Sequence, residues 1–406
     1  MSGLLPVPEA RARILSGLEA LPAERVVLAD ALGRTLAAPL AALRTQPPWD
    51  CSAMDGYAVR AADAASAPAR LRVVGEAAAG RGFGGRLGQA EALRIFTGAP
   101  LPSGADAVVI QEDATRDGDF VVLNEAARTG RHVRRAGLDF SEGETLLPAG
   151  RRLGARDLAL AAALGHGAID AARRPRVAIL ATGDELVAAG ELPGADQIVA
   201  SNSYAIAGVV AAEGGVAVDL GIAPDERSAI LAAINRAIDD EVDVLVTLGG
   251  ASVGDHDLVQ PLLEEAGVAL DFWRIAMRPG KPMMAGRRGG MLALGLPGNP
   301  VSAIVCSLLF LAPAIRKLSG RPDVEPPLAP ARLGRDMPEN DQREDYMRAA
   351  LTFDSDGIAV ATAFPRQDSS MLRPLADAEC LLIRPAHAPA ARAGDACSIM
   401  ALAHPL

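Results

Sequence analysis

Apolar and polar positions alternate in two different ways along residues 176–319 of this chain. Four short, nearly continuous apolar runs have the length of strands that are buried on both faces. These runs are 176–181, 216–220, 242–247 and 291–295. Longer segments between them, such as 225–238, carry apolar residues at helical spacing. Strands that alternate with helices predict a parallel sheet covered on both faces, which is a doubly wound α/β domain.

The rest of the chain has shorter β-like runs that are separated by glycine and proline clusters. Residues 57–147 predict a β-rich insert domain, built as a small sandwich or barrel. A proline-rich linker occupies 320–330, and the segment 331–406 predicts a C-terminal β-barrel. Residues 1–56 and 148–175 are expected to form an N-terminal helical and linker region.

Composition limits the possible classes of function. The net charge is −10, and the chain has two tryptophans, three tyrosines and eight phenylalanines. This argues against a nucleic-acid binder, which needs a basic surface and aromatic platforms. The four cysteines share no short spacing, so we expect reduced thiols. No uninterrupted apolar run reaches about 18 residues, and residues 1–20 are amphipathic. The sequence therefore predicts a soluble, cytoplasmic protein with no membrane partner.

Glycine-rich segments follow three of the predicted strands. The carboxyl ends of strands in a doubly wound sheet form one edge, where ligands bind. Glycines there let backbone N–H groups approach an anion, and Asn299 followed by Pro300 is typical of a helix start. Each segment alone could be only a tight turn, but three together favour a phosphate site. Its candidate ligand-binding residues are Thr182, Gly249, Gly250, Ser252, Pro297, Gly298, Asn299, Pro300 and Ser302.

Charged residues flank the same glycine-rich segments. We predict that Arg274, Arg278 and Lys281 lie on the strand after the helix that begins at Asp257, where they could bind oxyanions. Arginine is the usual basic residue of this chain, so Arg274 or Arg278 by itself could be an ordinary surface charge. Lys281 differs from them, because it is one of two lysines among 40 basic residues. Glu185, Asp225 and Asp257 also follow strands.

Exposed acids usually serve only solvation. Beside a phosphate site, however, these carboxylates would repel the ligand unless a cation lay between them. Mg²⁺ bound by one or two carboxylates and by substrate phosphates would meet this need. Glu185 and Asp257 are the candidate metal ligands. Outside the α/β domain, Asp55, Thr97 and Asp139 lie in polar turns to which physical reasoning alone assigns no role.

At these positions the sequence resembles the MoeA-type molybdopterin molybdenumtransferase family. The resemblance covers nearly the whole chain and is weakest over 60–91 and the proline-rich linker. The segments before residue 100 are specific to this longer family, whereas the Thr182 segment is shared with related molybdopterin-binding domains. The matching segments are Ser52-Ala-Met-Asp-Gly-Tyr-Ala, Phe96-Thr-Gly-Ala-Pro-Leu-Pro-Ser-Gly-Ala-Asp-Ala-Val, Thr182-Gly-Asp-Glu-Leu, Gly249-Gly-Ala-Ser-Val-Gly, Arg278-Pro-Gly-Lys-Pro and Leu296-Pro-Gly-Asn-Pro-Val-Ser.

The resemblance implies a reaction and a set of site residues. Family members insert molybdate into adenylylated molybdopterin with Mg²⁺, and they release AMP. They are homodimers whose active cleft lies between the α/β domain of one subunit and the β-rich insert of the other. Family positions match the catalytic candidates Asp55, Asp139, Glu185, Asp225 and Asp257, the substrate-binding Thr97, and the prolines Pro297 and Pro300. Arg274 and Arg278 stand where family members often carry lysine.

Two other functions remain open from the sequence. One is a scaffold that only holds molybdopterin. The other is the adenylyltransferase of the preceding step, which shares the α/β domain but lacks the segments before residue 100. Possible protein partners are that adenylyltransferase and the apo-enzymes that accept the finished cofactor.

Overall fold

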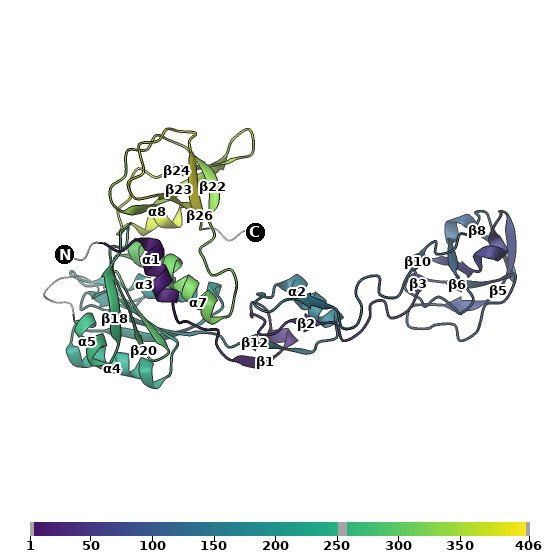
Figure 1. The fold of residues 1–406 in the computed structure, drawn as a ribbon, viewed down its shortest axis with the longest axis horizontal. Helices are drawn as coiled ribbons and strands as arrows, with labels where there is room; N and C mark the ends of the chain where they lie inside the picture. The colour runs from purple at the N-terminus through teal and green to yellow at the C-terminus, as the bar shows by residue number, and fades with distance from the viewer. Residues whose placement is uncertain (1–3, 251–257, 403–406) are drawn as a thin grey trace.

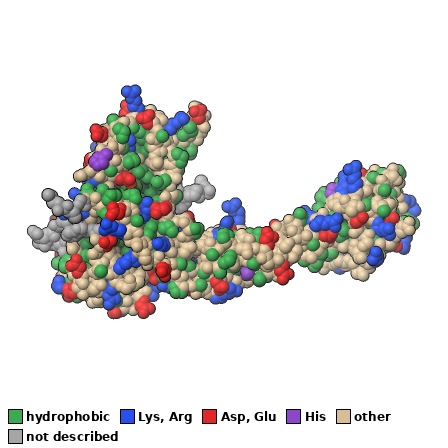
Figure 2. Space-filling model, in the orientation of Figure 1, with side chains coloured by type: hydrophobic (Ala, Val, Ile, Leu, Met, Phe, Trp, Pro, Cys, Tyr) green, Lys and Arg blue, Asp and Glu red, His purple; other side chains and the backbone are tan. Residues whose placement is uncertain are grey.

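The computed structural model describes residues 4–250 and 258–402, which form an elongated molecule (Figure 1). An α/β domain and a β-barrel lie together at one end, and a β-rich insert lies at the other. A small layer joins them through the narrow middle of the molecule. In the face drawn in Figure 2, acidic and basic side chains are intermixed over all of these parts.

The α/β domain is built on a six-stranded sheet in the order β16-β13-β17-β21-β20-β18. Its strands are β13 (Arg176–Thr182), β16 (Val216–Ala223), β17 (Val244–Leu248), β18 (Ala269–Arg274), β20 (Pro282–Arg288) and β21 (Met291–Leu296). Four strands are parallel, whereas β20 and β18 run antiparallel to their neighbours. The predicted doubly wound α/β domain is confirmed, but the prediction of a parallel sheet was wrong for the edge formed by β20 and β18. Gly289 and Gly290 form a two-residue turn that returns β20 directly into β21, with Gly289 at a φ of +57°.

Helices cover both faces of this sheet, as the sequence predicted. Helices α4 (Arg227–Asp239) and α5 (Val259–Glu265) pack on one face. The other face is covered by α1 (Val7–Leu15), α3 (Ser201–Ala212), α6 (Pro300–Cys306), η4 (Ser307–Leu311) and α7 (Ala312–Leu318). Val7 and Ile14 of α1 are buried in this core, so the first helix packs with the α/β domain rather than with the linker region.

The helical stretch Pro300–Leu318 is apolar enough to cross a membrane by length and composition, the one helix of this kind in the described parts of the chain. Two serines and two basic residues interrupt it, so it contains no uninterrupted apolar run of about 18 residues. In the structure, 78% of its most apolar 18-residue segment is buried, as in the core helix of a folded domain.

Two short pairs of strands and one helix make up the middle layer. Strand β1 (Ala23–Val27) pairs with β12 (Ala168–Ala172), and β2 (Leu40–Ala41) pairs with β11 (Thr145–Leu147). Helix α2 (Ala155–Ala163) and η1 (Leu28–Asp30) pack over a core that includes Leu36, Phe140 and Ile169.

The insert is a six-stranded sheet in the order β7-β4-β6-β5-β9-β8. Its strands are β4 (Gly56–Val59), β5 (Ala69–Ala77), β6 (Glu91–Ile95), β7 (Ala107–Ile110), β8 (Ala114–Asp117) and β9 (Phe120–Leu123), with the short helices η2 (Ala61–Ala64) and η3 (Gln111–Asp113). Beside it, β3 (Cys51–Ser52) pairs with β10 (Val133–Arg134). The predicted β-rich insert is confirmed.

The C-terminal domain is a closed barrel of five strands, as predicted. Strand β23 (Glu344–Phe353) pairs with β24 (Ala359–Ala363) and with β25 (Cys380–Arg384). Strands β22 (Ala329–Leu333) and β26 (Ala396–Ala401) complete the circle between them. Helix α8 (Leu372–Ala376) lies on the side of the barrel that faces α6. A two-residue strand from the α/β domain, β19 (Met277–Arg278), extends β23 and joins the two domains.

Candidate active site

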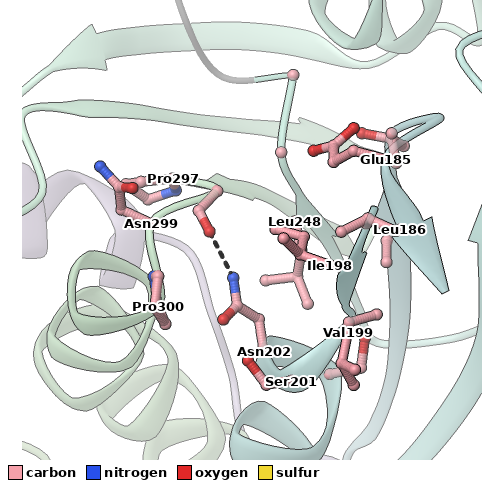
Figure 3. Close-up of a pocket in the computed structure, with 18 of the residues that line it drawn as sticks. Glu185, Leu186, Ile198, Val199, Ser201, Asn202, Leu248, Pro297, Asn299 and Pro300 are labelled. Atoms are coloured by element: carbon pink, nitrogen blue, oxygen red, sulfur yellow. Dashed lines mark hydrogen bonds between the residues drawn. The ribbon is translucent and has the colours of Figure 1, made fainter. Parts of the chain in front are cut away.

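A cavity of about 830 Å³ opens at the carboxyl ends of β13, β17 and β21 (Figure 3). It lies at the edge of the sheet where the sequence placed its anion site. Nine of the predicted site residues line it, eight from the three glycine-rich segments and Asp225 from the loop after β16. They are Thr182, Glu185, Asp225, Gly249, Gly250, Pro297, Gly298, Asn299 and Pro300. Ser252 and Asp257 lie outside the described residues.

Gly249 shows why a glycine is needed at the end of β17. Its φ is +97°, a conformation that costs an L side chain free energy. A Cβ at this position would also lie 2.8 Å from the carbonyl oxygen of Thr182. The β17 backbone can therefore turn close against β13 only without a side chain, and this leaves the strand-end peptide groups open to the cavity.

Asn202 joins the first turn of α3 to the third glycine-rich segment. Its amide Nδ2 donates to the backbone oxygen of Gly298 at 2.7 Å (Figure 3). Helix α3 begins at Ser201, and neither Ser201 nor Asn202 forms a side-chain cap at its start. Ser201, Asn202 and Ser203 all line the cavity, although they were not among the site residues predicted from the sequence. The run of serine and asparagine at the start of this helix is the sequence signal that could have identified them.

Asn299 and Pro300 begin α6, as predicted. Asn299 is the residue before the first turn, and Pro300 is the first helical residue. The Asn299 side chain makes no capping hydrogen bond, and it is among the residues that line the cavity. Ser302, predicted from the same segment, is buried in α6 and is not among the lining residues.

Two carboxylates line the cavity from neighbouring strand ends. Glu185 follows β13 and Asp225 follows β16. The backbone N–H of Asp225 donates to Asp184 Oδ1 at 3.0 Å, which ties the two loops together. Within residues 4–250 and 258–402, the structure contains no group of three or more acidic, histidine or cysteine ligands for a metal ion. A hard cation at this site would therefore depend on substrate oxygens as well as on these carboxylates.

The three predicted basic residues do not lie together on one strand, so that prediction was wrong. Arg274 ends β18, Arg278 belongs to β19, and Lys281 lies just before β20. The chain leaves the sheet after β18 to pair with the barrel, which separates the three positions. None of them is among the lining residues, although Pro282, next to Lys281, is.

Arg278 binds the barrel. Its Nε donates to Asp345 Oδ1 at 2.8 Å and its Nη2 to Asp345 Oδ2 at 2.5 Å, with Asp341 at 3.4 Å. The hydrogen bonds to Asp345 raise the pKa of the Arg278 guanidinium above its usual value. In this structure its charge is thus matched by the acids of the barrel rather than directed at the cavity.

Asp55 and Thr97 form a second polar cluster, in the insert. Both the backbone N–H and the hydroxyl of Thr97 donate to Asp55 Oδ1 at 2.8 Å. These hydrogen bonds are the main cause that lowers the pKa of Asp55 below its usual value. The two segments that the resemblance had identified before residue 100 are therefore bound to each other.

This cluster is far from the cavity in a single chain, because the insert lies at the opposite end of the molecule (Figure 1). Asp139 is exposed where the chain returns from the insert to the middle layer, and its N–H donates to the Gln46 carbonyl at 3.0 Å. None of Asp55, Thr97 and Asp139 is among the residues that line the cavity.

The barrel also contributes to the cavity wall. Ser370 and Leu372 line it, and the Val301 N–H donates to the Ser369 carbonyl at 3.1 Å. No pattern in the sequence pointed to this contribution. The contact joins residues about 70 positions apart, and only the docking of the barrel beside α6 creates it.

Family models match three successive parts of the chain. Residues 5–165 match the MoeA N-terminal region (domain I and II), residues 178–317 match a probable molybdopterin binding domain, and residues 330–402 match the MoeA C-terminal region (domain IV). A molybdopterin molybdenumtransferase from Nostoc sp. is 38% identical over 336 residues, 81% of this chain and 77% of that protein. The chain belongs to the MoeA family.

Other MoeA relatives cover the chain almost from end to end. The molybdopterin molybdenumtransferase of Haemophilus influenzae is 32% identical over 94% of both chains. The crystal structure of the molybdopterin biosynthesis MoeA protein from Pyrococcus horikoshii matches with a TM-score of 0.83 and 28% identity. It covers 98% of this chain and 100% of that one. The MoeA fold thus includes the insert and the barrel as well as the molybdopterin-binding domain.

Proposed function

We propose that this MoeA-family chain is a molybdopterin molybdenumtransferase, which inserts molybdenum from molybdate into adenylylated molybdopterin and releases AMP. The observation that carries the proposal is the cavity at the strand ends of a molybdopterin-binding domain. Its volume suits a small ligand, and its glycine-rich wall offers backbone N–H groups to phosphate oxygens.

Oxyanion binding at this cavity is assigned to backbone groups and to Lys281. The segments at 182–185, 249–250 and 297–300 present peptide groups at one edge. Lys281 is exposed next to the lining residue Pro282, where its ammonium can approach a bound phosphate. Arg274 ends a strand of the same sheet and remains a predicted contact.

Mg²⁺ is proposed as the cofactor on the basis of the donors present. Glu185 and Asp225 offer hard carboxylate oxygens on the wall where phosphates would bind. Glu185 and the predicted ligand Asp257 would hold the ion, which would neutralise phosphate charge. Glu185 and Asp225 would also orient the water that breaks the anhydride P–O bond, so that AMP departs with one phosphate.

We further propose that two copies of the chain form one complete cleft. Asp55 and Thr97 lie at the far end from the cavity, too distant to act within the same chain (Figure 1). A homodimer in which the insert of one subunit covers the cavity of the other would bring the two clusters together.

Mixing two defective variants tests the shared cleft. Asp55→Asn disables the insert, and Glu185→Gln disables the cavity. A dimer of one subunit of each kind has one intact cleft, so random exchange should restore about a quarter of wild-type activity. Absence of any recovery after subunit exchange would contradict a shared cleft.

AMP release tests the chemistry directly. The wild-type chain should release AMP from adenylylated molybdopterin only when molybdate is present. Binding without AMP release would instead indicate a scaffold, and consumption of ATP without molybdate would indicate an adenylyltransferase.

We also propose a cytoplasmic location and two kinds of protein partner. The four cysteines are free in the structure, which suits the reducing cytoplasm. The chemistry of the reaction places a supplier of adenylylated molybdopterin before this chain and apo-enzymes that accept the cofactor after it.

A further inference from the structure

Arg94 lies beside the Asp55 cluster, and it is neither a predicted site residue nor one of the residues that line the cavity. It belongs to β6, where it pairs with Tyr57 of β4 on one side and Glu76 of β5 on the other. Side chains at paired positions project from the same face of a sheet. Arg94 therefore lies next to Tyr57, two residues after Asp55.

The guanidinium of Arg94 is held in one place by several contacts. Its Nη2 donates to Gln111 Oε1 at 2.7 Å. Its Cζ lies 4.6 Å from the centre of the Phe96 ring and 5.3 Å from that of Tyr57. A planar cation that contacts two rings and an amide oxygen has few alternative orientations.

From this position Arg94 holds the backbone directly after Asp55. Its Nη1 donates to the Gly56 carbonyl at 3.2 Å, while the Gln111 N–H donates to the Asp55 carbonyl at 3.0 Å. Arg94 and Gln111 thus bind two successive peptide groups and also bind each other. The positive charge of Arg94 adds a smaller contribution to the hydrogen bonds from Thr97 that lower the pKa of Asp55.

The neighbouring segment is tied to the same turn from the other side. Ser52 exchanges two backbone hydrogen bonds with the segment after Thr97, through the Gly98 N–H at 2.9 Å and the Ala99 carbonyl at 3.0 Å. Oδ1 of Asp55 accepts both bonds from Thr97, and no hydrogen bond within the described ranges involves Oδ2. The direction of Oδ2 therefore depends on how rigidly the 52–57 turn is held.

We propose that Arg94 is a positioning residue that acts through Asp55, by holding the backbone carbonyl of Gly56. It fixes the direction of the free carboxylate oxygen without touching the substrate. The inference rests on the proposed function only in that it treats Asp55 as part of the active cleft.

Kinetics of an Arg94→Met variant test this role, with Arg70→Met as a matched control. Arg70 also stacks on an aromatic ring of the insert, 3.6 Å from the centre of Phe120, and pairs with Asp117, away from Asp55. Arg94→Met should lower kcat about tenfold or more, because a small displacement of a catalytic group is costly. The KM for adenylylated molybdopterin should change by less than about threefold, and Arg70→Met should stay within about twofold of wild type.

Two further variants separate positioning from folding. Arg94→Lys keeps the charge but loses the planar stack and the paired bonds, so it should recover only part of kcat. Gln111→Leu releases the guanidinium without altering the β6 strand, and it should reproduce part of the loss. If Arg94→Met prevents folding of the insert, these two variants still decide the question.

Hydrogen exchange provides a readout that does not depend on turnover. Amides of residues 52–57 should exchange faster in Arg94→Met, while those of β9 keep their protection. The proposal would be overturned if the amides of 52–57 were equally protected from exchange in the wild-type chain and in Arg94→Met. A wild-type kcat in Arg94→Met and Gln111→Leu would also overturn it. A wild-type chain that releases no AMP would instead contradict the proposed function and leave the exchange result as the test of Arg94.

Discussion

The side-chain amide of Asn202 donates a hydrogen bond of 2.7 Å to the carbonyl oxygen of Gly298, and both residues line the cavity. The two residues are 96 positions apart in the chain and belong to α3 and to the loop before α6. This bond keeps the Pro297–Pro300 loop at a fixed distance from the first turn of α3. This neutral hydrogen bond adds to the packing of α3 against α6 in holding this side of the cavity.

Replacement of Asn202 by alanine should weaken substrate binding. The loss of one hydrogen bond is worth about 1 kcal/mol, which corresponds to a rise in KM of about fivefold. Steady-state kinetics with adenylylated molybdopterin would measure the effect. Asn235, an exposed residue of α4, is the control, and Asn235→Ala should behave like wild type. An unchanged KM in Asn202→Ala would show that the loop is held by other contacts.

Gly249→Ala should destabilise the chain and impair the cavity. The new Cβ would lie 2.8 Å from the Thr182 carbonyl oxygen at a φ of +97°, so the backbone must move. We expect a loss of more than about 1 kcal/mol in the free energy of unfolding. Denaturant unfolding would measure it. Gly208→Ala is the matched control, because that glycine lies within α3 with open space around it, and alanine there should stabilise the helix.

Thr97→Val should raise the pKa of Asp55 toward its usual value. The Thr97 N–H and hydroxyl both stabilise the ionised carboxylate, and valine removes the hydroxyl. Because the folded pKa is below the unfolded value of about 3.9, the contribution of this pair to stability is fully present above about pH 4. It is lost as the pH falls through the folded pKa. Carbon NMR titration of labelled aspartate would follow the change, and Thr97→Ser should keep the low pKa.

Arg278→Met should loosen the barrel from the α/β domain. The pair with Asp345 joins the two domains, and Asp345 is buried whereas Arg278 is half-exposed at 47%. Methionine would leave the largely buried carboxylate of Asp345 without its partner. Because Arg278 itself is half-exposed, we expect a loss of about 1–2 kcal/mol in the free energy of unfolding. Thermal unfolding would measure the loss. A double variant with Asp345→Asn should be less destabilised than the sum of the two single variants. If the destabilisation of the double variant equals the sum of the two single effects, Arg278 and Asp345 are not directly coupled.

Local patterns in the sequence determined the α/β domain and one wall of its site. The apolar run of β13 and the helical spacing of α4 depend on residues that are close in the chain. The positive φ of Gly249 is likewise a local feature, because the backbone conformation of one residue already favours glycine there. Such features can be recognised without the fold because the steric and solvation rules that produce them act over a few residues.

Only the tertiary structure decided which distant side chains meet. It placed Arg278 against Asp345 of the barrel, brought Ser370 to the cavity wall and set Asp55 at the far end of the molecule. It also reversed β20 within a sheet that the sequence predicted to be parallel. A side chain's charge or polarity says nothing about its partner across 60 or more positions, because domain docking, and not local spacing, selects that partner. The sequence therefore determined which kinds of residue form the site, while packing between domains decided which individual residues meet there.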